Sequence, residues 1–205
     1  MGEYPAMPWQ THVPEELQHL YEIHDHRHAA ALLSCEFPDE FEELCGALAR
    51  FRFHPDDILA GGGSESRIPK RMSKILRPLG WRESRLTAKM LVDDREVCVD
   101  THKVDYLKGR VAFDLEWNSK DQTFDRDLFA FRTFFEYDKI SVGVLVTRSN
   151  ELDPWFKSLG RAIFAKYGAS TTHMGKLLPR LAAGRSGGCP VLVFGITTAL
   201  LETAQ

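Results

Sequence analysis

Hydrophobic and polar residues alternate strictly over one short stretch near the middle of the chain. Between residues 111 and 118, large apolar side chains alternate with Ala112, Asp114, Glu116 and Asn118. This period of two is typical of a strand with one apolar and one polar face. Asp114 and Glu116 are therefore expected to point the same way.

A second strand is expected directly before this one. Lys108 and Gly109 form a turn signal, and a turn of two or four residues here places Asp105 opposite Ala112, on the face of Asp114 and Glu116. Opposed residues lie about 5 Å apart and diagonal ones about 7 to 8 Å apart. Three carboxylates this close repel one another unless a cation lies among them. A three-residue turn would send Asp105 to the other face, and a solvated strand face is the alternative for any one of these acids.

The rest of the chain predicts helices and strands that alternate. Apolar residues recur at helical spacing in six segments, 15–34, 38–51, 67–79, 125–135, 154–167 and 177–183. A hairpin is expected over 86–92 and 96–99, and buried strands over 140–147 and 190–196. This order predicts an α/β fold with a mixed central sheet flanked by helices.

Length and composition indicate one soluble globular domain. The chain has 205 residues, of which 43% are hydrophobic and 27% charged, and no apolar run approaches the length of a membrane span. The first residues lack the features of a secretory signal. Four cysteines occur without a Cys-x-x-Cys pair, so we expect reduced thiols in a cytoplasmic protein.

Charge is distributed unevenly along the chain. The net charge of −3 argues against a generic polyanion binder, yet residues 67–89 hold eight Lys and Arg against Glu83 alone, and residues 154–201 hold six and no acid. Two basic blocks around an acidic hairpin form the layout that a nuclease needs. A solvated helix face is the alternative for either block.

The acidic hairpin and the segments around it resemble the PD-(D/E)XK nucleases, and most closely the BglII- and BstYI-like type II restriction endonucleases. Asp105 is followed by Asp114-x-Glu116, by Phe124 and Asp127-Leu128-Phe129, and by the run from Asp138 to Val144. Segments 80–85 and 184–196 are also similar to this family, and BamHI is a more distant likeness. The resemblance covers residues 80–196, while the helical N-terminal part agrees only in general character.

The resemblance implies a single nuclease domain over residues 1–205, with a mainly helical part (1–79) and a catalytic core with recognition loops (80–205). It implies Mg²⁺-dependent, sequence-specific hydrolysis of palindromic double-stranded DNA by a homodimer, with Mn²⁺ able to substitute. Asp105 and Asp114 would bind the metal, and Glu116 would be a further ligand or the general base. Asp114 stands where family members have glutamate, and Glu116 where most have lysine or glutamine.

Candidate DNA contacts are basic and polar side chains in three places. Lys70 lies in the first basic block, and Lys103, Asn118 and Lys120 flank the acids. The loop from Ser170 to Lys176 is the expected recognition loop, with an ordinary helix-capping loop as its alternative. The complete set is Lys70, Lys103, Asn118, Lys120, Ser170, Thr171, Thr172, His173, Lys176 and Arg185.

Two other functions remain open at this stage. The chain could be a non-specific or structure-selective DNA nuclease of the same fold, or an inactive DNA-binding protein. The sequence leaves undetermined the recognition sequence, the cut position, the number of metal ions, a companion methyltransferase, and whether Glu65 or Asn118 joins the active site.

Overall fold

The computed structural model describes residues 8–59, 67–100 and 103–202. Its helices are α1 (Glu15–Leu20), α2 (Ala29–Glu36), α3 (Pro38–Arg50), α4 (Pro55–Leu59), α5 (Arg67–Leu76), α6 (Thr123–Glu136), α7 (Asp153–Ser158), α8 (Arg161–Lys166) and α9 (Met174–Ala182). Its strands are β1 (Tyr21–His26), β2 (Arg82–Ser84), β3 (Thr87–Val92), β4 (Arg95–Asp100), β5 (Val104–Lys108), β6 (Val111–Glu116), β7 (Val142–Arg148) and β8 (Val191–Ile196).

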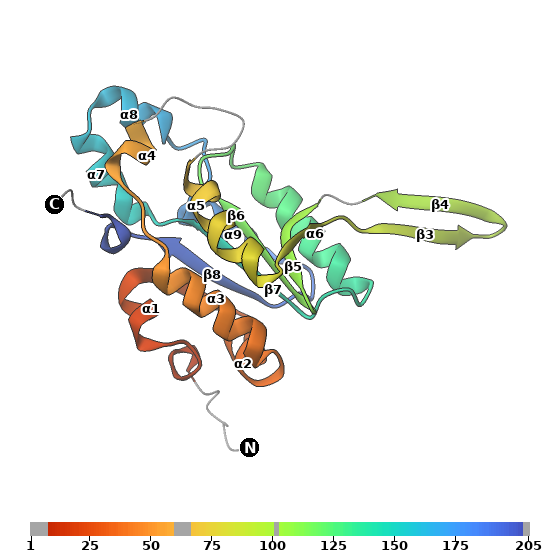
Figure 1. Cartoon of the computed structure of the whole chain (residues 1–205). Helices are drawn as coiled ribbons and strands as arrows, with labels where there is room; N and C mark the ends of the chain where they lie inside the picture. Colours follow the sequence, from red (N-terminus) through yellow and green to blue (C-terminus); the bar gives the residue numbers. More distant parts are fainter. Residues whose placement is uncertain (1–7, 60–66, 101–102, 203–205) are drawn as a thin grey trace, which may run out of the picture.

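Six of the described strands form one mixed sheet in the order β1-β8-β7-β6-β5-β2 (Figure 1). The three central strands β6, β7 and β8 run parallel, and their outer neighbours pair antiparallel to them. Parallel strands require crossover connections, which α6 and the α7–α9 segment provide. The predicted α/β fold with a mixed central sheet is therefore confirmed.

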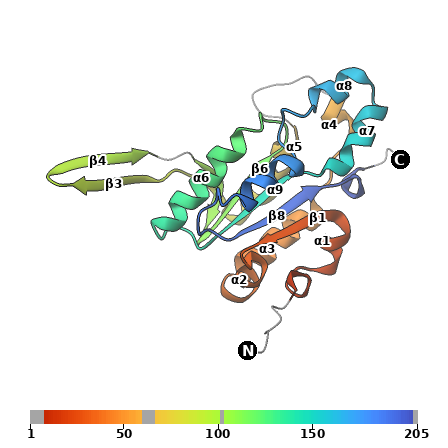
Figure 2. The same cartoon turned by 180° about the vertical axis from the view of Figure 1, so that it is seen from behind.

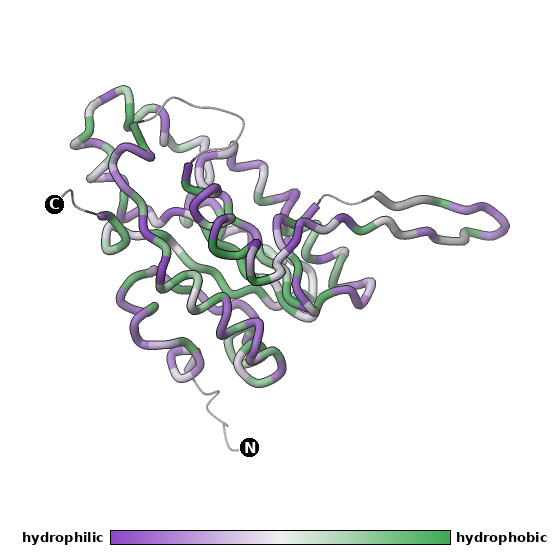
Figure 3. The backbone as a smooth tube through the Cα atoms, viewed as in Figure 1, coloured by the Kyte–Doolittle hydropathy of each residue, from purple (hydrophilic) through white to green (hydrophobic). Residues whose placement is uncertain are grey.

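Helices cover both faces of the sheet. Alternate residues of β7 divide between two apolar clusters, with Val144 and Val146 facing α1–α5 and α7, and Leu145 facing α6 and α9. Figure 2 shows α6 and α9 side by side on their face. Figure 3 shows that the central strands are drawn mostly in the green of hydrophobic residues. None of the described helices is long and apolar enough to cross a bilayer.

Strand β6 has the two-faced pattern that its sequence predicts. Val111, Phe113 and Leu115 belong to the first cluster, whereas Ala112 belongs to the second, beneath α6. Asp114 and Glu116 follow Ala112 at steps of two, so they project toward the same side. The acids thus face α6.

The register of the β5–β6 hairpin differs from the prediction. Leu107 pairs with Ala112 and Lys108 with Val111, so the turn residues are Gly109 and Arg110. Gly109 has a φ of 52°, a left-handed conformation that glycine adopts without strain. The prediction that Asp105 lies opposite Ala112 is wrong, because continuing the observed register places it opposite Asp114. A shift of two residues keeps the same face, so the expected meeting of the acids survives.

The N-terminal part is less helical than predicted. The expected helix over 15–34 is interrupted by β1, which pairs antiparallel with β8. Tyr21 and Ile23 are buried at alternate positions, and the chain turns at Arg27 and His28, which both have positive φ. The expected helix over 154–167 is likewise divided into α7 and α8 at Gly160, whose φ is 106°. The glycine-rich loop with Glu65 lies outside the described residues.

The predicted first hairpin is confirmed as β3 and β4, which pair over their full length. These two strands form a separate sheet and project away from the body (Figure 1).

Candidate active site

Two backbone N–H groups hold the carboxylates of Asp105 and Asp114 across the hairpin. The backbone N–H of Asp105 donates to Asp114 Oδ1 over 2.6 Å, and the N–H of Leu115 donates to Asp105 Oδ2 over 3.3 Å. Asp114 is 3% exposed, while Asp105 lies at the surface. The pair therefore links a buried acid to one that solvent can reach.

Glu116 and a fourth acid, Asp127 of α6, extend this pair. The side chains of Glu116 and Asp127 are 13% and 4% exposed, and Arg126 lies within 4.0 Å of both carboxyl groups. The sequence reasoning missed Asp127. A signal was present, because Asp127 lies four and seven residues before Phe131 and Phe134 and so falls on the buried face of the helix. We call Asp105, Asp114, Glu116 and Asp127 the acid cluster.

Burial and mutual repulsion raise the pKa of the buried acids. Burial, followed by the charge of Asp105, raises the pKa of Asp114 well above its usual range. Burial also raises the pKa of Glu116, and a hydrogen bond with Ser119 opposes that shift. The pKa of Asp127 rises to about 10, mainly through burial and then through the charge of Asp114. The protein thus holds these acids where their anionic forms are disfavoured.

Three buried oxygens at this place have no hydrogen-bond partner in the described part of the chain: Asp114 Oδ2, Asp127 Oδ2 and Asn118 Oδ1. Buried polar atoms are normally paired, so such a group points to a partner that the folded chain does not itself supply. The atoms that could coordinate a cation are all oxygens, and oxygen ligands suit Mg²⁺ or Mn²⁺. In chemistry and burial, the acid cluster fits a hard divalent cation.

The present side-chain positions do not form a finished metal site. Within the described ranges, no group of three or more His, Cys, Asp or Glu side chains is arranged so that it could hold a metal ion. Metal binding by Asp105, Asp114 and Glu116 therefore stays a prediction, and it requires these side chains to move closer together.

Three basic side chains follow or precede the acids in the sequence, and they differ in their contacts. Lys103 is held by Glu83, with Nζ 2.6 Å from Oε1. Lys120 is exposed, and its backbone forms an isolated antiparallel β-bridge with Thr171. Arg126, at the start of α6, has its guanidinium 4.0 Å from Glu116 Oε1 and 3.6 Å from Asp127 Oδ1. Sequence reasoning named the two lysines and missed Arg126.

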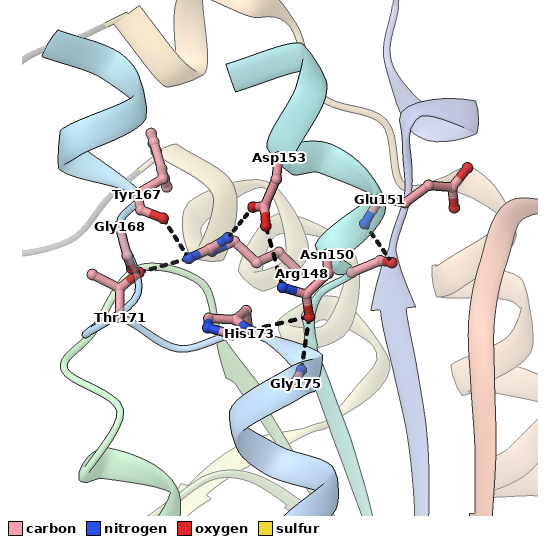
Figure 4. Close-up of polar contacts among 10 residues, drawn as sticks. Arg148, Asn150, Glu151, Asp153, Tyr167, Gly168, Thr171, His173 and Gly175 are labelled. Carbon is pink, nitrogen blue, oxygen red and sulfur yellow. Dashed lines mark hydrogen bonds and ion pairs between the residues drawn. The ribbon is translucent and has the colours of Figure 1, made fainter. Parts of the chain in front are cut away.

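The expected recognition loop is tied to the end of β7 by Arg148 (Figure 4). This arginine is 1% exposed, and one of its terminal nitrogens donates to the Tyr167 carbonyl over 2.7 Å and to Thr171 Oγ1 over 2.6 Å. The other terminal nitrogen lies 3.3 Å from Asp153. The hydroxyl of Thr171 therefore has a partner inside the protein.

Asn150 fixes the far end of the same loop (Figure 4). Its Oδ1 accepts the N–H of Gly175 over 2.8 Å and lies 3.1 Å from His173 Nδ1. Thr172 is completely buried, so in this conformation it supports the loop and does not present its side chain to DNA, contrary to expectation.

Among the other predicted DNA contacts, Ser170 and Arg185 are exposed, and Lys176 is partly exposed. Lys176 lies 3.9 Å from Asp121, and Arg185 lies 3.7 Å from Asp125. Lys70 is separate from this group. It belongs to α5, which packs on the opposite face of the sheet from Asp114, and lines a cavity of about 910 Å³ with other basic residues.

A sheet with acids on two adjacent strands, followed by a helix that covers them, defines an α/β nuclease core. A family model described as Restriction endonuclease BglII/BglIII matches residues 21–196. The match begins with the first residue of β1 and ends with the last residue of β8, so it spans the whole sheet. The chain belongs to this family of restriction endonucleases, which are nucleases and therefore hydrolases. No curated protein matches the chain.

Proposed function

We propose that this protein is a type II restriction endonuclease that hydrolyses phosphodiester bonds at a palindromic site in double-stranded DNA, with Mg²⁺ as its cofactor and Mn²⁺ as a substitute. The observation that carries the proposal is the acid cluster. In this chain, which belongs to a restriction endonuclease family, Asp114 Oδ2 is buried and has no hydrogen-bond partner among the described residues. A homodimer in the cytoplasm is part of the proposal, because a two-fold protein matches a two-fold site.

Asp105 and Asp114 would hold the divalent ion, and Glu116 would be a further ligand or the general base. When bound, the ion supplies positive charge to the scissile phosphate and increases the acidity of a water molecule. The chain's own contribution is to keep Asp114 in place through the N–H of Asp105 and to keep Glu116 largely out of solvent. A raised pKa makes the ionised carboxylate of Glu116 a stronger base toward the attacking water.

DNA would contact the exposed side chains around this site. Lys103 and Lys120 are proposed phosphate contacts, and Ser170, His173, Lys176 and Arg185 are proposed contacts of the recognition loop and the segment after α9. Thr171 would act through its bond to Arg148, which holds the loop in one shape. Pre-ordering a loop in this way lowers the entropy lost on binding.

The test is incubation of the purified protein with a sequenced plasmid in Mg²⁺ or EDTA, followed by sequencing of the fragment ends. We expect discrete fragments that share one palindrome, only in Mg²⁺, and a loss of at least about 10³-fold in Asp114→Asn. Glu136→Gln changes an exposed acid at the end of α6, so it is the control and should cleave normally.

Other outcomes separate the alternatives. A smear of fragments would indicate a non-specific or structure-selective nuclease. Intact plasmid, from a protein that still binds DNA, would indicate a binding protein and contradict the enzymatic function.

A further inference from the structure

The acid cluster contains four carboxylates and has one arginine beside it. Arg126 lies in the first turn of α6, and its side chain is 49% exposed. One terminal nitrogen is 4.0 Å from Glu116 Oε1, and Nε is 3.6 Å from Asp127 Oδ1. The guanidinium therefore borders both the buried acids and the solvent from which a substrate would approach.

The donors of Arg126 are only loosely engaged. At 3.6 and 4.0 Å its two ion pairs are longer than hydrogen bonds, and it makes no hydrogen bond to the residues that the structure describes. Arg180 provides a contrast, since it donates to Asp125 over 3.1 Å and to the Lys176 carbonyl over 2.8 Å. The N–H groups of Arg180 are thus used within the protein, whereas the N–H groups of Arg126 can still bind another acceptor.

The chemistry at this place requires a fixed positive charge. Hydrolysis of a phosphodiester increases the negative charge on the phosphoryl oxygens, and an oriented donor near them stabilises the transition state. The strand position two residues after Asp114 holds Glu116, which is an acid and cannot provide that charge. An arginine remains protonated at all physiological pH values and binds phosphate oxygens through two parallel hydrogen bonds.

We propose that Arg126 is a catalytic residue, whose guanidinium donates hydrogen bonds to the non-bridging oxygens of the scissile phosphodiester and so supplies from α6 the positive charge that β6 lacks. This inference rests on the proposed function, because it takes DNA as the substrate. In the reaction, a bond forms between the water oxygen and phosphorus while the bond from phosphorus to the 3′ oxygen breaks. Glu116 takes one proton from the water, the 3′ oxygen receives one from solvent, and Arg126 stays protonated throughout.

Asp127 is the positioning residue in this arrangement. It is buried beneath the first turn of α6, and Oδ1 holds Arg126 Nε at 3.6 Å, near Glu116. A surface arginine without such a neighbour would sample many rotamers. The buried acid thus favours positions of the guanidinium near the acid cluster, while the distance of 3.6 Å leaves its donors available to another acceptor.

The experiment measures single-turnover cleavage of a duplex with the identified site in Mg²⁺, and duplex affinity in Ca²⁺. Arg126→Ala should lower the cleavage rate constant by about 100- to 1000-fold. Its dissociation constant should change by less than about tenfold, because one phosphate contact contributes little to total affinity. Added guanidinium ion should restore part of the rate in Arg126→Ala.

Two further variants control for folding and for general charge. Arg126→Lys keeps the charge without the paired donors, so it should retain more activity than Arg126→Ala. Arg132→Ala removes an exposed arginine from the same helix, and its rate constant should stay within about threefold of wild type. Thermal unfolding of each variant checks that the fold is retained.

Distinct results would overturn the inference. If wild type cleaves and Arg126→Ala cleaves equally fast, Arg126 is not catalytic while the proposed function stands. If Arg126→Ala loses rate and affinity by the same factor, Arg126 only binds DNA. If wild-type protein leaves the duplex intact in Mg²⁺, both the proposed function and the role of Arg126 fail together.

Discussion

Two groups of charged side chains are buried in this protein, and the fold treats them in opposite ways. Arg148, at the end of β7, has protein acceptors for both terminal nitrogens, although not for Nε, and lies 5.7 and 5.8 Å from the ring centres of Phe156 and Tyr167. The acid cluster, under the start of α6, brings like charges together and leaves Asp114 Oδ2 and Asp127 Oδ2 unpartnered. A buried charge with partners supports the structure, whereas buried like charges without partners destabilise it.

The difference indicates what each place is for. Arg148 joins β7 to the loop after α8, so its burial gives that loop a defined shape. No comparable structural benefit is apparent for the acid cluster, because hydrophobic residues of similar size would pack there without repulsion. Retaining such a site is physically reasonable when a ligand of opposite charge completes it.

The largest expected effect on stability is at Arg148. Arg148→Met should lower the free energy of unfolding by about 3 kcal/mol, because Asp153 and two loop acceptors lose their partner. Urea denaturation of the metal-free protein measures this difference. Arg132→Met, on the exposed side of α6, should change it by less than about 0.5 kcal/mol. Equal stability of the two variants would show that Arg148 does not stabilise the fold.

A substitution in the acid cluster should change the free energy of unfolding in the opposite direction. Asp114→Asn should raise the free energy of unfolding of the metal-free protein by about 1 to 2 kcal/mol at pH 8, because it removes a buried carboxyl whose anionic form is disfavoured. A raised folded-state pKa means that the folded chain binds more protons than the unfolded chain. Wild-type stability should therefore fall as pH rises above the unfolded pKa of about 4, toward the raised folded values.

Urea denaturation at pH 5.5 and pH 8 tests this prediction. The advantage of Asp114→Asn over wild type should shrink at the lower pH, because the neutral form of the wild-type carboxyl is favoured there. A variant less stable than wild type at pH 8 would mean that Asp114 is satisfied in the folded protein, and the contrast with Arg148 would disappear.

The smallest expected effect is at Asn150. Asn150→Ala should lower the free energy of unfolding by about 1 kcal/mol, since the N–H of Gly175 loses its acceptor. Hydrogen exchange at the C-terminal end of the segment 170–176 should become faster, because the loop loses its hydrogen bond to Asn150 there, while the backbone bonds of Ser170 and Thr172 to the segment 119–121 remain. Glu151→Ala, which removes an exposed neighbouring side chain, is the control. Unchanged exchange in Asn150→Ala would show that Arg148 and the backbone bonds to residues 119–121 hold the loop without Asn150.

Local patterns in the sequence were sufficient for several elements of the fold. The alternation from Val111 to Trp117 predicts β6 and its faces because strand geometry is local and has a period of two. The same reasoning correctly places β3 with β4, α3, and the buried strand β8. The meeting of Asp105 with Asp114 was also accessible, since any shift of the hairpin by two residues preserves the face.

Other features depended on neighbours far along the chain. Tyr21–His26 is compatible with helical spacing, and it is a strand because the edge of β8 offers it hydrogen bonds from 170 residues later. The exact register of β5 with β6 depended on which residues took the turn, Gly109 and Arg110 in place of Lys108 and Gly109. Neither the strand at Tyr21–His26 nor the register of β5 with β6 is determined by residue propensity alone.

For the candidate site, the sequence by itself determined that Asp114 and Glu116 share one face of β6 and predicted that Asp105 joins them across the hairpin, because these follow from residue type and local periodicity. Only the tertiary structure decided that Asp127 and Arg126 of α6 join them, that Thr172 is buried, and that Arg148 contacts the loop before α9. The physical reason is that burial and electrostatic partnership depend on packing between elements. The spacing of residues along one strand or helix contains no information on which other element will cover it.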